Sequence, residues 1–179
     1  MVYILLAPGF EEAEALVPAD LLRRAGIKTA LVSLNGETVT GSHNITVSAD
    51  MTLDKVDLSN GEMVVLPGGG VGVQNLGLEP AVAALVRQAA ASGLPVAAIC
   101  AAPTLLGEWG LLEGKQAVCY PGMEGQLTGA QTRMEQRFVA DGKIITGRAA
   151  GSAFDFGLAL VEALAGLDEA EKVRHAIHY

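Results

Sequence analysis

The sequence predicts an α/β domain with a mostly parallel sheet and helices on both faces. Short apolar runs alternate with helical patterns along the whole chain, which is typical of this arrangement. Glycine is abundant, with 22 residues, while aromatic residues make up only 4%, which favours a core of Ala, Val and Leu with close helix–sheet contacts. At 179 residues, we expect one domain over residues 1–179 with a substantial core.

The first half of the chain contains strands of branched apolar residues and one amphipathic helix. Gly26 is expected to end that helix, Pro18 to kink it, and Gly41 to turn two short alternating runs into a small antiparallel excursion. The predicted elements are a strand at 2–6, the helix at 11–25, a strand at 27–34 and the excursion at 36–50.

In the second half, a buried strand at 63–66 runs into a glycine-rich turn, and an Ala/Val/Leu stripe predicts a helix at 79–92. Asp141-Gly142 lies between two apolar runs and predicts a hairpin. The remaining expected elements are a strand and helix around Cys100, hairpin strands at 137–140 and 143–146, a helix at 152–165 capped by Ser152, and a charged tail helix from Asp168.

Charge and cysteine content exclude several classes. The net charge is −8 with only 12 Lys and Arg, so a nucleic-acid partner is not expected. No apolar stretch approaches membrane-spanning length, and the first residues lack the basic region of a signal peptide. Two cysteines without a CxxC motif do not form a disulfide framework, so we expect a reduced, cytoplasmic protein with no cofactor and no metal.

Cys100 ends the apolar run from Leu94 to Ile99 and precedes small residues that open a helix. A strand-to-helix turn lies at the carboxyl edge of a parallel sheet, where open α/β folds bind ligands. The positive end of a helix favours a thiolate, so we expect the pKa of Cys100 to fall below about 8.5. From position alone, a structural buried cysteine and a reactive cysteine both remain open.

Two further segments follow strands and reach the same edge. Gly68-Gly69-Gly70 is either a simple turn or a set of backbone amides that approach an anion closely. After the first strand, Glu11, Glu12 and Glu14 complement a helix dipole. We expect Glu11 and Glu12 to face solvent and Glu14 to face the crevice beside Cys100, where burial and a nearby thiolate would keep its carboxyl protonated.

Four motifs together resemble the DJ-1/ThiJ/PfpI family, in order and spacing, over nearly the whole chain. They are APGFEEAE at 7–14, VVLPGG at 64–69, AICAAPT at 98–104 and ITGRAAGS at 145–152. The chain is most similar to the DJ-1 branch, because PfpI-type proteases carry a histidine after the nucleophile, where this chain has Ala101.

The resemblance implies a flavodoxin-like three-layer sandwich with a nucleophile elbow at Cys100 and protonated Glu14 as its partner. Backbone amides of Gly69 and Ala101 would form an oxyanion-type pocket. It also implies a homodimer whose contact lies near the first helix and the small hairpin. Arg148 matches a family arginine near the pocket and Arg24 one that reaches it from the partner subunit; the alternatives are an ordinary ion pair and a solvated helix residue.

The chain departs from the family pattern at two positions. Tyr120 stands where many DJ-1 proteins have a histidine assigned as acid or base, and tyrosine is a poor base at neutral pH. His43 replaces an arginine in the hairpin segment and is either a pocket residue that titrates near neutrality or an exposed loop histidine. Cys119 is either a second thiol near the pocket or an ordinary strand-end cysteine. His175 and His178 lack a third metal ligand.

The function implied first is glyoxalase III-like or deglycase-like chemistry on small reactive carbonyls through Cys100 and Glu14. The alternative is a redox-sensing, stress-protective chaperone in which Cys100 is oxidised to a sulfinate, since accessible thiolates are the groups that peroxide oxidises. A third possibility is an inert paralogue that keeps the fold for partner binding.

Overall fold

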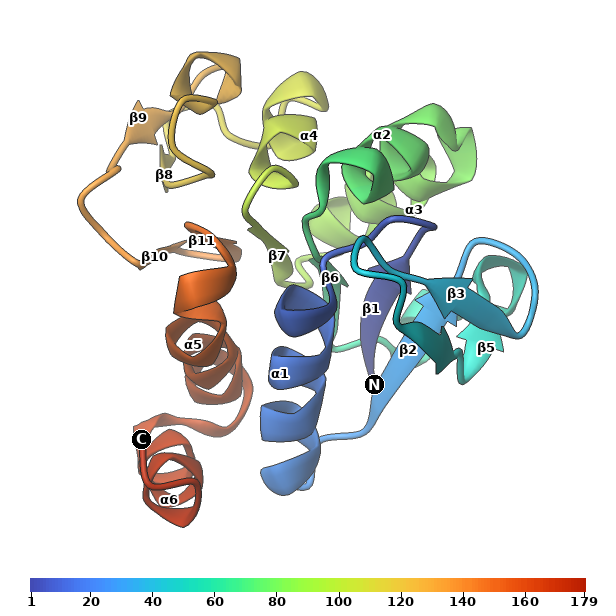
Figure 1. Cartoon of the computed structure of the whole chain (residues 1–179). Coiled ribbons are helices and arrows are strands. Elements are labelled where there is room, and N and C mark those ends of the chain that lie inside the picture. The colour runs from blue at the N-terminus through green and yellow to red at the C-terminus, as the bar shows by residue number, and fades with distance from the viewer.

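A seven-stranded sheet forms the centre of the computed structural model, which describes all of residues 1–179 (Figure 1). The strand order is β10-β11-β7-β6-β1-β2-β5. The strands are β1 (Val2–Leu6), β2 (Thr29–Ser33), β5 (Met51–Thr52), β6 (Met63–Leu66), β7 (Val96–Ile99), β10 (Phe138–Asp141) and β11 (Ile144–Gly147).

The sheet is parallel except at one edge. β1 pairs with β2 and β6, β7 pairs with β6 and β11, and β5 pairs with β2, all in parallel. β10 pairs with β11 antiparallel through the turn at Gly142, which confirms the predicted hairpin. The mostly parallel α/β class that the sequence predicts is therefore confirmed.

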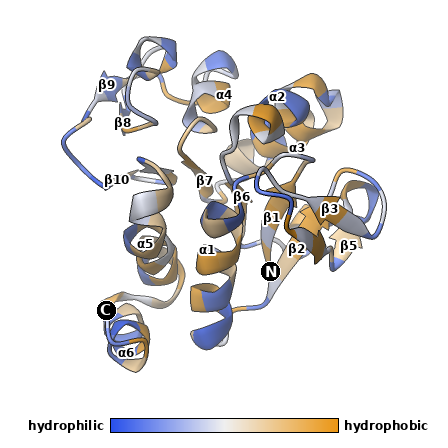
Figure 2. Ribbon diagram, viewed as in Figure 1, coloured by the Kyte–Doolittle hydropathy of each residue, from blue (hydrophilic) through white to orange (hydrophobic).

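Two helical layers enclose the sheet. One layer contains α1 (Glu12–Arg24), α5 (Ala153–Ala165) and α6 (Leu167–Ala176), and the other contains α2 (Gly70–Leu78), α3 (Pro80–Ala91) and α4 (Pro103–Glu108). Strand side chains alternate between the layers: Ile4 packs with α1 and α5, while Leu5 packs with α2 and α3. Figure 2 shows the apolar residues of these strands between the layers.

Two small sheets lie outside the central one. β3 (Thr38–Thr40) and β4 (Thr46–Ser48) form the predicted antiparallel excursion, and β8 (Gln116–Ala117) pairs in parallel with β9 (Gln131–Thr132). The loop between β3 and β4 bonds back to the segment just before α1, because Ser42 N–H donates to Phe10 C=O at 2.8 Å. This places the hairpin loop close to the carboxyl end of β1.

The structure differs from the sequence prediction at two helices. α2 was not expected, because its sequence GVGVQNLGL contains three glycines and reads as an interrupted helix. Ser152 is the N-cap residue of α5, as predicted, but its side chain does not cap the helix: the hydroxyl bonds the backbone of Ala149, upstream of the helix. No helix is both long enough and apolar enough to cross a bilayer.

Candidate active site

Three segments meet at the carboxyl edge of the sheet. α1 follows β1 and carries Glu14, the Gly68–Gly69 turn follows β6, and Cys100 follows β7. β6, which ends at this turn, pairs with both of the other strands, so the three chain segments that follow are neighbours in space. The topology therefore brings together the residues that the sequence had placed at one sheet edge.

Cys100 sits on a strained turn. Its φ is +66°, in the left-handed region that a non-glycine residue rarely adopts and that costs about 1–3 kcal/mol. Backbone bonds on both sides fix this conformation: Cys100 N–H donates to Gly147 C=O at 2.9 Å, and Cys100 C=O accepts from Tyr120 N–H at 2.7 Å. The sharp turn leaves the side chain partly exposed, as a reactive thiol requires.

Glu14 is completely buried and faces Cys100. Its Oε2 accepts a hydrogen bond from Gly68 N–H at 2.9 Å, and its Oε1 is buried without a hydrogen-bond partner. A Cβ at Gly68 would lie 2.6 Å from Cβ and 3.0 Å from Sγ of Cys100, and it would also clash with Glu14 Oε2. Gly68 thus lets the carboxyl and the thiol approach each other.

The two groups control each other's ionisation. Burial raises the pKa of Glu14 to about 7, with a further contribution from the charge of Glu11, against hydrogen bonds from Cys100 and Gly68 that lower it. Burial, followed by the charge and hydrogen bond of Glu14, raises the pKa of Cys100 to about 12. The pair therefore holds two protons below about pH 7, and one proton and one negative charge from about pH 7 to about 12.

This corrects the sequence-based expectation for the thiol. A pKa below the ordinary value was expected from the helix terminus, but burial and the facing carboxylate of Glu14 outweigh it. Two backbone groups act in the expected direction: the amides of Gly69 and Ala101 lower the pKa of Cys100. A negative charge on sulfur is thus solvated by two amides once the proton resides on Glu14.

Gly69 reaches the sulfur through a conformation that only glycine adopts readily. Its φ is +92°, and a Cβ there would lie 2.6 Å from Glu11 N and would also collide with Gly9 O. This close approach to the start of α1 fixes the peptide that follows β6. The amides of Gly69 and Ala101 therefore converge on Sγ from two different strand ends.

The remaining predicted pocket residues are less closely engaged. Tyr120 is 50% exposed, and its hydroxyl makes no hydrogen bond within the chain. Arg148 follows β11 and is partly buried, but it pairs with no carboxylate, so the ion pair considered for it is absent. Arg24 is an exposed residue that pairs with Asp20 at 2.6 Å. Arg24 also lies about 15 Å along α1 from Glu14, given the rise of a helix.

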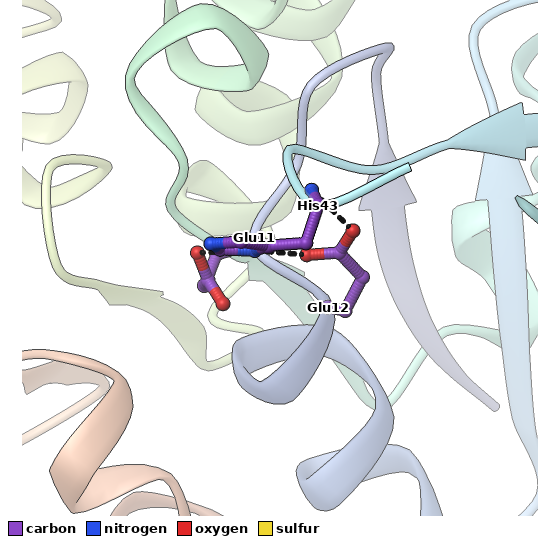
Figure 3. Close-up of side chains that lie close together, drawn as sticks. All are labelled: Glu11, Glu12 and His43. Carbon is purple, nitrogen blue, oxygen red and sulfur yellow. Dashed lines mark hydrogen bonds and ion pairs between the residues drawn. The ribbon is translucent and has the colours of Figure 1, made fainter. Parts of the chain in front are cut away.

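Glu12 and His43 hold the hairpin loop against α1 (Figure 3). Glu12 Oε1 accepts from His43 N–H at 2.7 Å, and Glu12 Oε2 lies 2.9 Å from His43 Nδ1. Ser42 Oγ donates to Glu12 Oε2 at 3.2 Å and to Glu11 Oε2 at 3.1 Å. A Cβ at Gly41 would collide with the Glu12 carboxylate, so glycine is required beneath it.

The expectation that Glu12 faces solvent is wrong, because these contacts bury it to 5% exposure. Burial opposes its ionisation, but hydrogen bonds from the side chain and backbone of His43 and from Ser42 lower the pKa of Glu12 to about 2. Glu12 in return raises the pKa of His43. His43 itself is an exposed loop residue, as one of the two alternatives proposed. The periodicity of the sequence did not predict this contact between Glu12 and the hairpin loop, which we call the Glu12 tether, because it joins residues 31 positions apart.

Glu11, Glu12 and His43 are also the three side chains whose potential metal-ligating atoms cluster, all within 4.8 Å of one another. Ion pairing already accounts for this proximity, because His43 Nδ1 lies 3.6 Å from Glu11 and 2.9 Å from Glu12. Cys119 is fully buried, and burial raises the pKa of its thiol to about 11. It is a strand-end core cysteine rather than a second accessible thiol.

Together, the parallel sandwich and the positive-φ cysteine facing a buried glutamate define a cysteine-elbow protein of the α/β class. Known proteins agree with this class. The sequence model described as the DJ-1/PfpI family matches residues 1–163. The chain belongs to the DJ-1/PfpI family.

Several relatives extend over nearly the whole chain. Protein dj-1beta of Drosophila melanogaster is 40% identical over 172 residues, covering 95% of this chain and 92% of the relative. The Parkinson disease protein 7 homolog of Danio rerio is 36% identical, covering 96% and 93%. A protein named as a deglycase from Pyrococcus horikoshii is 31% identical over 148 residues, covering 82% and 89%.

Solved structures show the same fold. A mutant of a DJ-1 superfamily protein from Salmonella typhimurium superposes with a TM-score of 0.94 at 37% identity, covering 99% of this chain and 97% of the other. Drosophila melanogaster DJ-1beta gives 0.92 at 38% identity, covering 98% and 96%. Toxoplasma gondii DJ-1, described as oxidized, gives 0.94 at 33% identity, covering 99% and 97%. The flavodoxin-like sandwich expected from the resemblance is confirmed.

Proposed function

We propose that the protein converts small reactive carbonyl compounds through Cys100, with Glu14 as the proton carrier and without a cofactor. The observation that carries this proposal is the buried Glu14 carboxyl facing a strained, partly exposed thiol. A pKa of about 7 lets Glu14 both accept and donate a proton at neutral pH. The relationship to a protein named as a deglycase supports carbonyl chemistry of this kind.

The first step generates the nucleophile. The thiol proton moves from Sγ to Glu14, which leaves the total charge of the pair unchanged. The resulting thiolate accepts hydrogen bonds from Gly69 and Ala101 N–H. When Sγ attacks the aldehyde carbon of an α-oxoaldehyde such as methylglyoxal, a C–S bond forms and the carbonyl electron pair moves to oxygen. The two amides then stabilise the developing oxyanion.

The later steps need one proton carrier. Glu14 protonates the oxyanion to give a hemithioacetal, and its carboxylate then removes the proton from the former aldehyde carbon. Return of that proton to the neighbouring carbon, together with transfer of the hydroxyl proton to the former ketone oxygen, converts the adduct into a thioester of lactate. Water hydrolyses the thioester to lactate and regenerates the thiol, so methylglyoxal and water are converted to lactate with no external oxidant.

Tyr120 stands where many DJ-1 proteins have a histidine, so the proposed mechanism uses no histidine as acid or base there. Tyr120 is exposed, and in this proposal its hydroxyl donates a hydrogen bond to the substrate rather than acting as a base. Arg148 is a second candidate for contact with the substrate, since it follows β11 beside Cys100 and has no carboxylate partner.

The test is lactate production from methylglyoxal without glutathione, measured for the wild type, Cys100→Ser and Glu14→Gln. We expect turnover in the wild type, none above background in Cys100→Ser and a loss of about 100-fold or more in Glu14→Gln, in line with general acid–base catalysis. Equal rates in all three proteins would refute the proposal.

The second candidate function is a redox sensor with a chaperone role. It is favoured by the partly exposed sulfur and by the similarity to a solved DJ-1 described as oxidized. Two successive two-electron oxidations, each by one peroxide molecule that is reduced to water, would convert the thiolate to a sulfenate and then to a sulfinate, whose oxygens would bond Glu14 and the two amides. The test is intact mass after mild peroxide. A gain of two oxygen atoms should disappear in Cys100→Ser, and an adduct that persists there contradicts this role.

We also propose that the protein is a cytoplasmic homodimer, as in the family resemblance. The contact would involve α1 and the β3–β4 hairpin, and Arg24 would approach Cys100 only from a second copy, because it is distant within its own chain. Light scattering should give twice the mass of 18.4 kDa. A monomer at micromolar concentration would contradict this assignment.

A further inference from the structure

A groove of about 550 Å³ lies between α2 and α4, at the same carboxyl edge of β6 and β7 that carries the glycine-rich turn and Cys100. Gly70 and Ala101 are among the residues that line it. Each is adjacent in the chain to a residue of the reacting centre: Gly70 follows Gly69, and Ala101 follows Cys100. The groove, which α2 and α4 line, therefore reaches residues next to the two amides that would hold a substrate oxyanion.

The walls of the groove are mainly apolar. Val73 and Leu78 line it from α2, Leu105 lines it from α4, and Met123 lines it from the loop beyond β8. Leu78 is 80% exposed, which is unusual for a large apolar side chain beside a cavity, while Val73 and Leu105 are only 6% exposed. An alkyl chain bound in the groove would remove this apolar surface from water.

The polar side chains of the groove exclude an anionic occupant. Gln74, Thr104 and Gln126 are neutral, and Glu108 is the only charged residue that lines it. No Lys, Arg or His contributes to the walls, so a carboxylate or phosphate would meet only a negative charge. Neutral apolar chains fit both the lining and the volume, which lies within the range of small-molecule sites.

We propose that this groove binds the side chain of the substrate, and that the substrate of Cys100 is a carbonyl compound with a neutral alkyl chain of several carbons. The inference rests on the proposed function for the reaction at Cys100, but it concerns a separate surface. The carbonyl lies at the Gly69 and Ala101 amides, and the chain lies between Val73 and Leu105. Methylglyoxal, with one methyl group, would leave most of the groove empty.

The test uses thiol-reactive probes, because they report the groove without turnover. Rates of Cys100 modification by N-methylmaleimide, N-hexylmaleimide and a maleimide with a carboxylate-ended chain are measured by mass spectrometry and divided by the rates for glutathione. We expect the hexyl compound to gain about tenfold over the methyl compound, from partial burial of the added methylenes. The carboxylate-ended chain should lose this gain.

Two variants alter the groove by different means. Leu78→Gln removes an exposed apolar wall, and Gly77→Leu fills the groove, since even a Cβ at Gly77 would lie 3.0 Å from Leu105 Cδ2. Both should abolish the preference for the hexyl chain. The control is Val71→Thr, at a position that is 59% exposed on the same helix but does not line the groove. It should keep the preference.

Equal normalised rates for the methyl and hexyl probes in the wild type would overturn the proposal, as would a preference that survives in both groove variants. Turnover of α-oxoaldehydes of increasing chain length then separates the two proposals. Turnover without any chain preference upholds the reaction and overturns the groove assignment. A chain preference of the probes without turnover of any aldehyde upholds the groove and contradicts the proposed reaction.

Discussion

The Cys100 thiol and the Glu14 carboxyl face each other across Gly68, where a Cβ would lie 3.0 Å from Sγ and would overlap Glu14 Oε2. Gly68 N–H bonds the same carboxyl at 2.9 Å. The turn after β6 therefore positions Glu14 and at the same time leaves the space in which the two groups meet. The fully buried carboxyl and the partly buried thiol each shift the pKa of the other, so their titrations are coupled.

Gly68→Ala should separate this pair. The added methyl must displace Cys100 or Glu14, so we expect a loss of stability of about 1–3 kcal/mol from overpacking and a rate of Cys100 alkylation lowered by about tenfold or more. Urea unfolding and adduct mass measure the two effects. Gly151→Ala is the matched control, since a Cβ there meets nothing within 4 Å. If both variants behave alike, the role assigned to Gly68 is wrong.

Glu14→Gln should change how stability depends on pH. The pKa of Glu14 rises from an ordinary 4.5 to about 7 on folding, so the folded state binds the proton more tightly. Its contribution to stability is fully present below pH 4.5 and is lost as pH rises towards 7, a difference of about 3 kcal/mol. Unfolding free energies of the wild type should fall over this interval relative to those of the Gln variant. Parallel curves for the two proteins would contradict the raised pKa.

Cys100→Gly should stabilise the fold while abolishing reactivity. Glycine adopts a φ of +66° freely, whereas any other residue is strained there. Compared with Cys100→Ala, which keeps the strain and also lacks the thiol, Cys100→Gly should be more stable by about 1 kcal/mol. Thermal unfolding of the two variants measures the difference. A glycine variant less stable than the alanine variant would show that the elbow is not strained.

Glu12→Gln should loosen the hairpin loop from α1. The carboxylate accepts from His43 N–H, His43 Nδ1 and Ser42 Oγ, and the depressed pKa of about 2 means that this charge stabilises the fold above pH 4.5 and is lost as pH falls towards 2. We expect a loss of about 1–2 kcal/mol at pH 7 from weakened charge-assisted bonds. Amide hydrogen exchange at residues 41–45 should accelerate.

Glu37→Gln provides the comparison for that experiment, because it removes an acidic residue exposed near the base of the same hairpin. It should leave exchange at residues 41–45 unchanged. Equal acceleration in both variants would mean that net charge, and not the Glu12 tether, controls the loop.

The sequence predicted the fold well where patterns are local. Buried strands such as Met63–Leu66 and the Asp141-Gly142 hairpin were recognisable from apolar runs and turn residues. α2 was not, because three glycines lower its intrinsic helix propensity. Tertiary packing stabilises α2 despite this low propensity. Val73 and Leu76 are buried in the core, and Gly72 allows the helix to approach Phe10 closely.

At the site, sequence position identified Cys100, Glu14 and the glycine-rich turn, because parallel strands bring their carboxyl ends to one edge. The direction of the thiol pKa was not predictable, since it depends on how deeply Glu14 is buried and how near it lies. The Glu12 tether was missed for a similar reason. Its partners Ser42 and His43 become neighbours only when the hairpin folds back over α1.

The pH dependence of Cys100 alkylation, compared between the wild type and Glu14→Gln, tests most directly whether these two groups share one proton. If they do, the wild-type rate rises with an inflection near the pKa of about 7 given for Glu14, because loss of the pair's first proton creates the reactive thiolate. In Glu14→Gln the inflection moves well above 7, since a buried thiol then titrates alone. A wild-type rate that rises only near pH 12, or identical profiles for both proteins, would contradict the account.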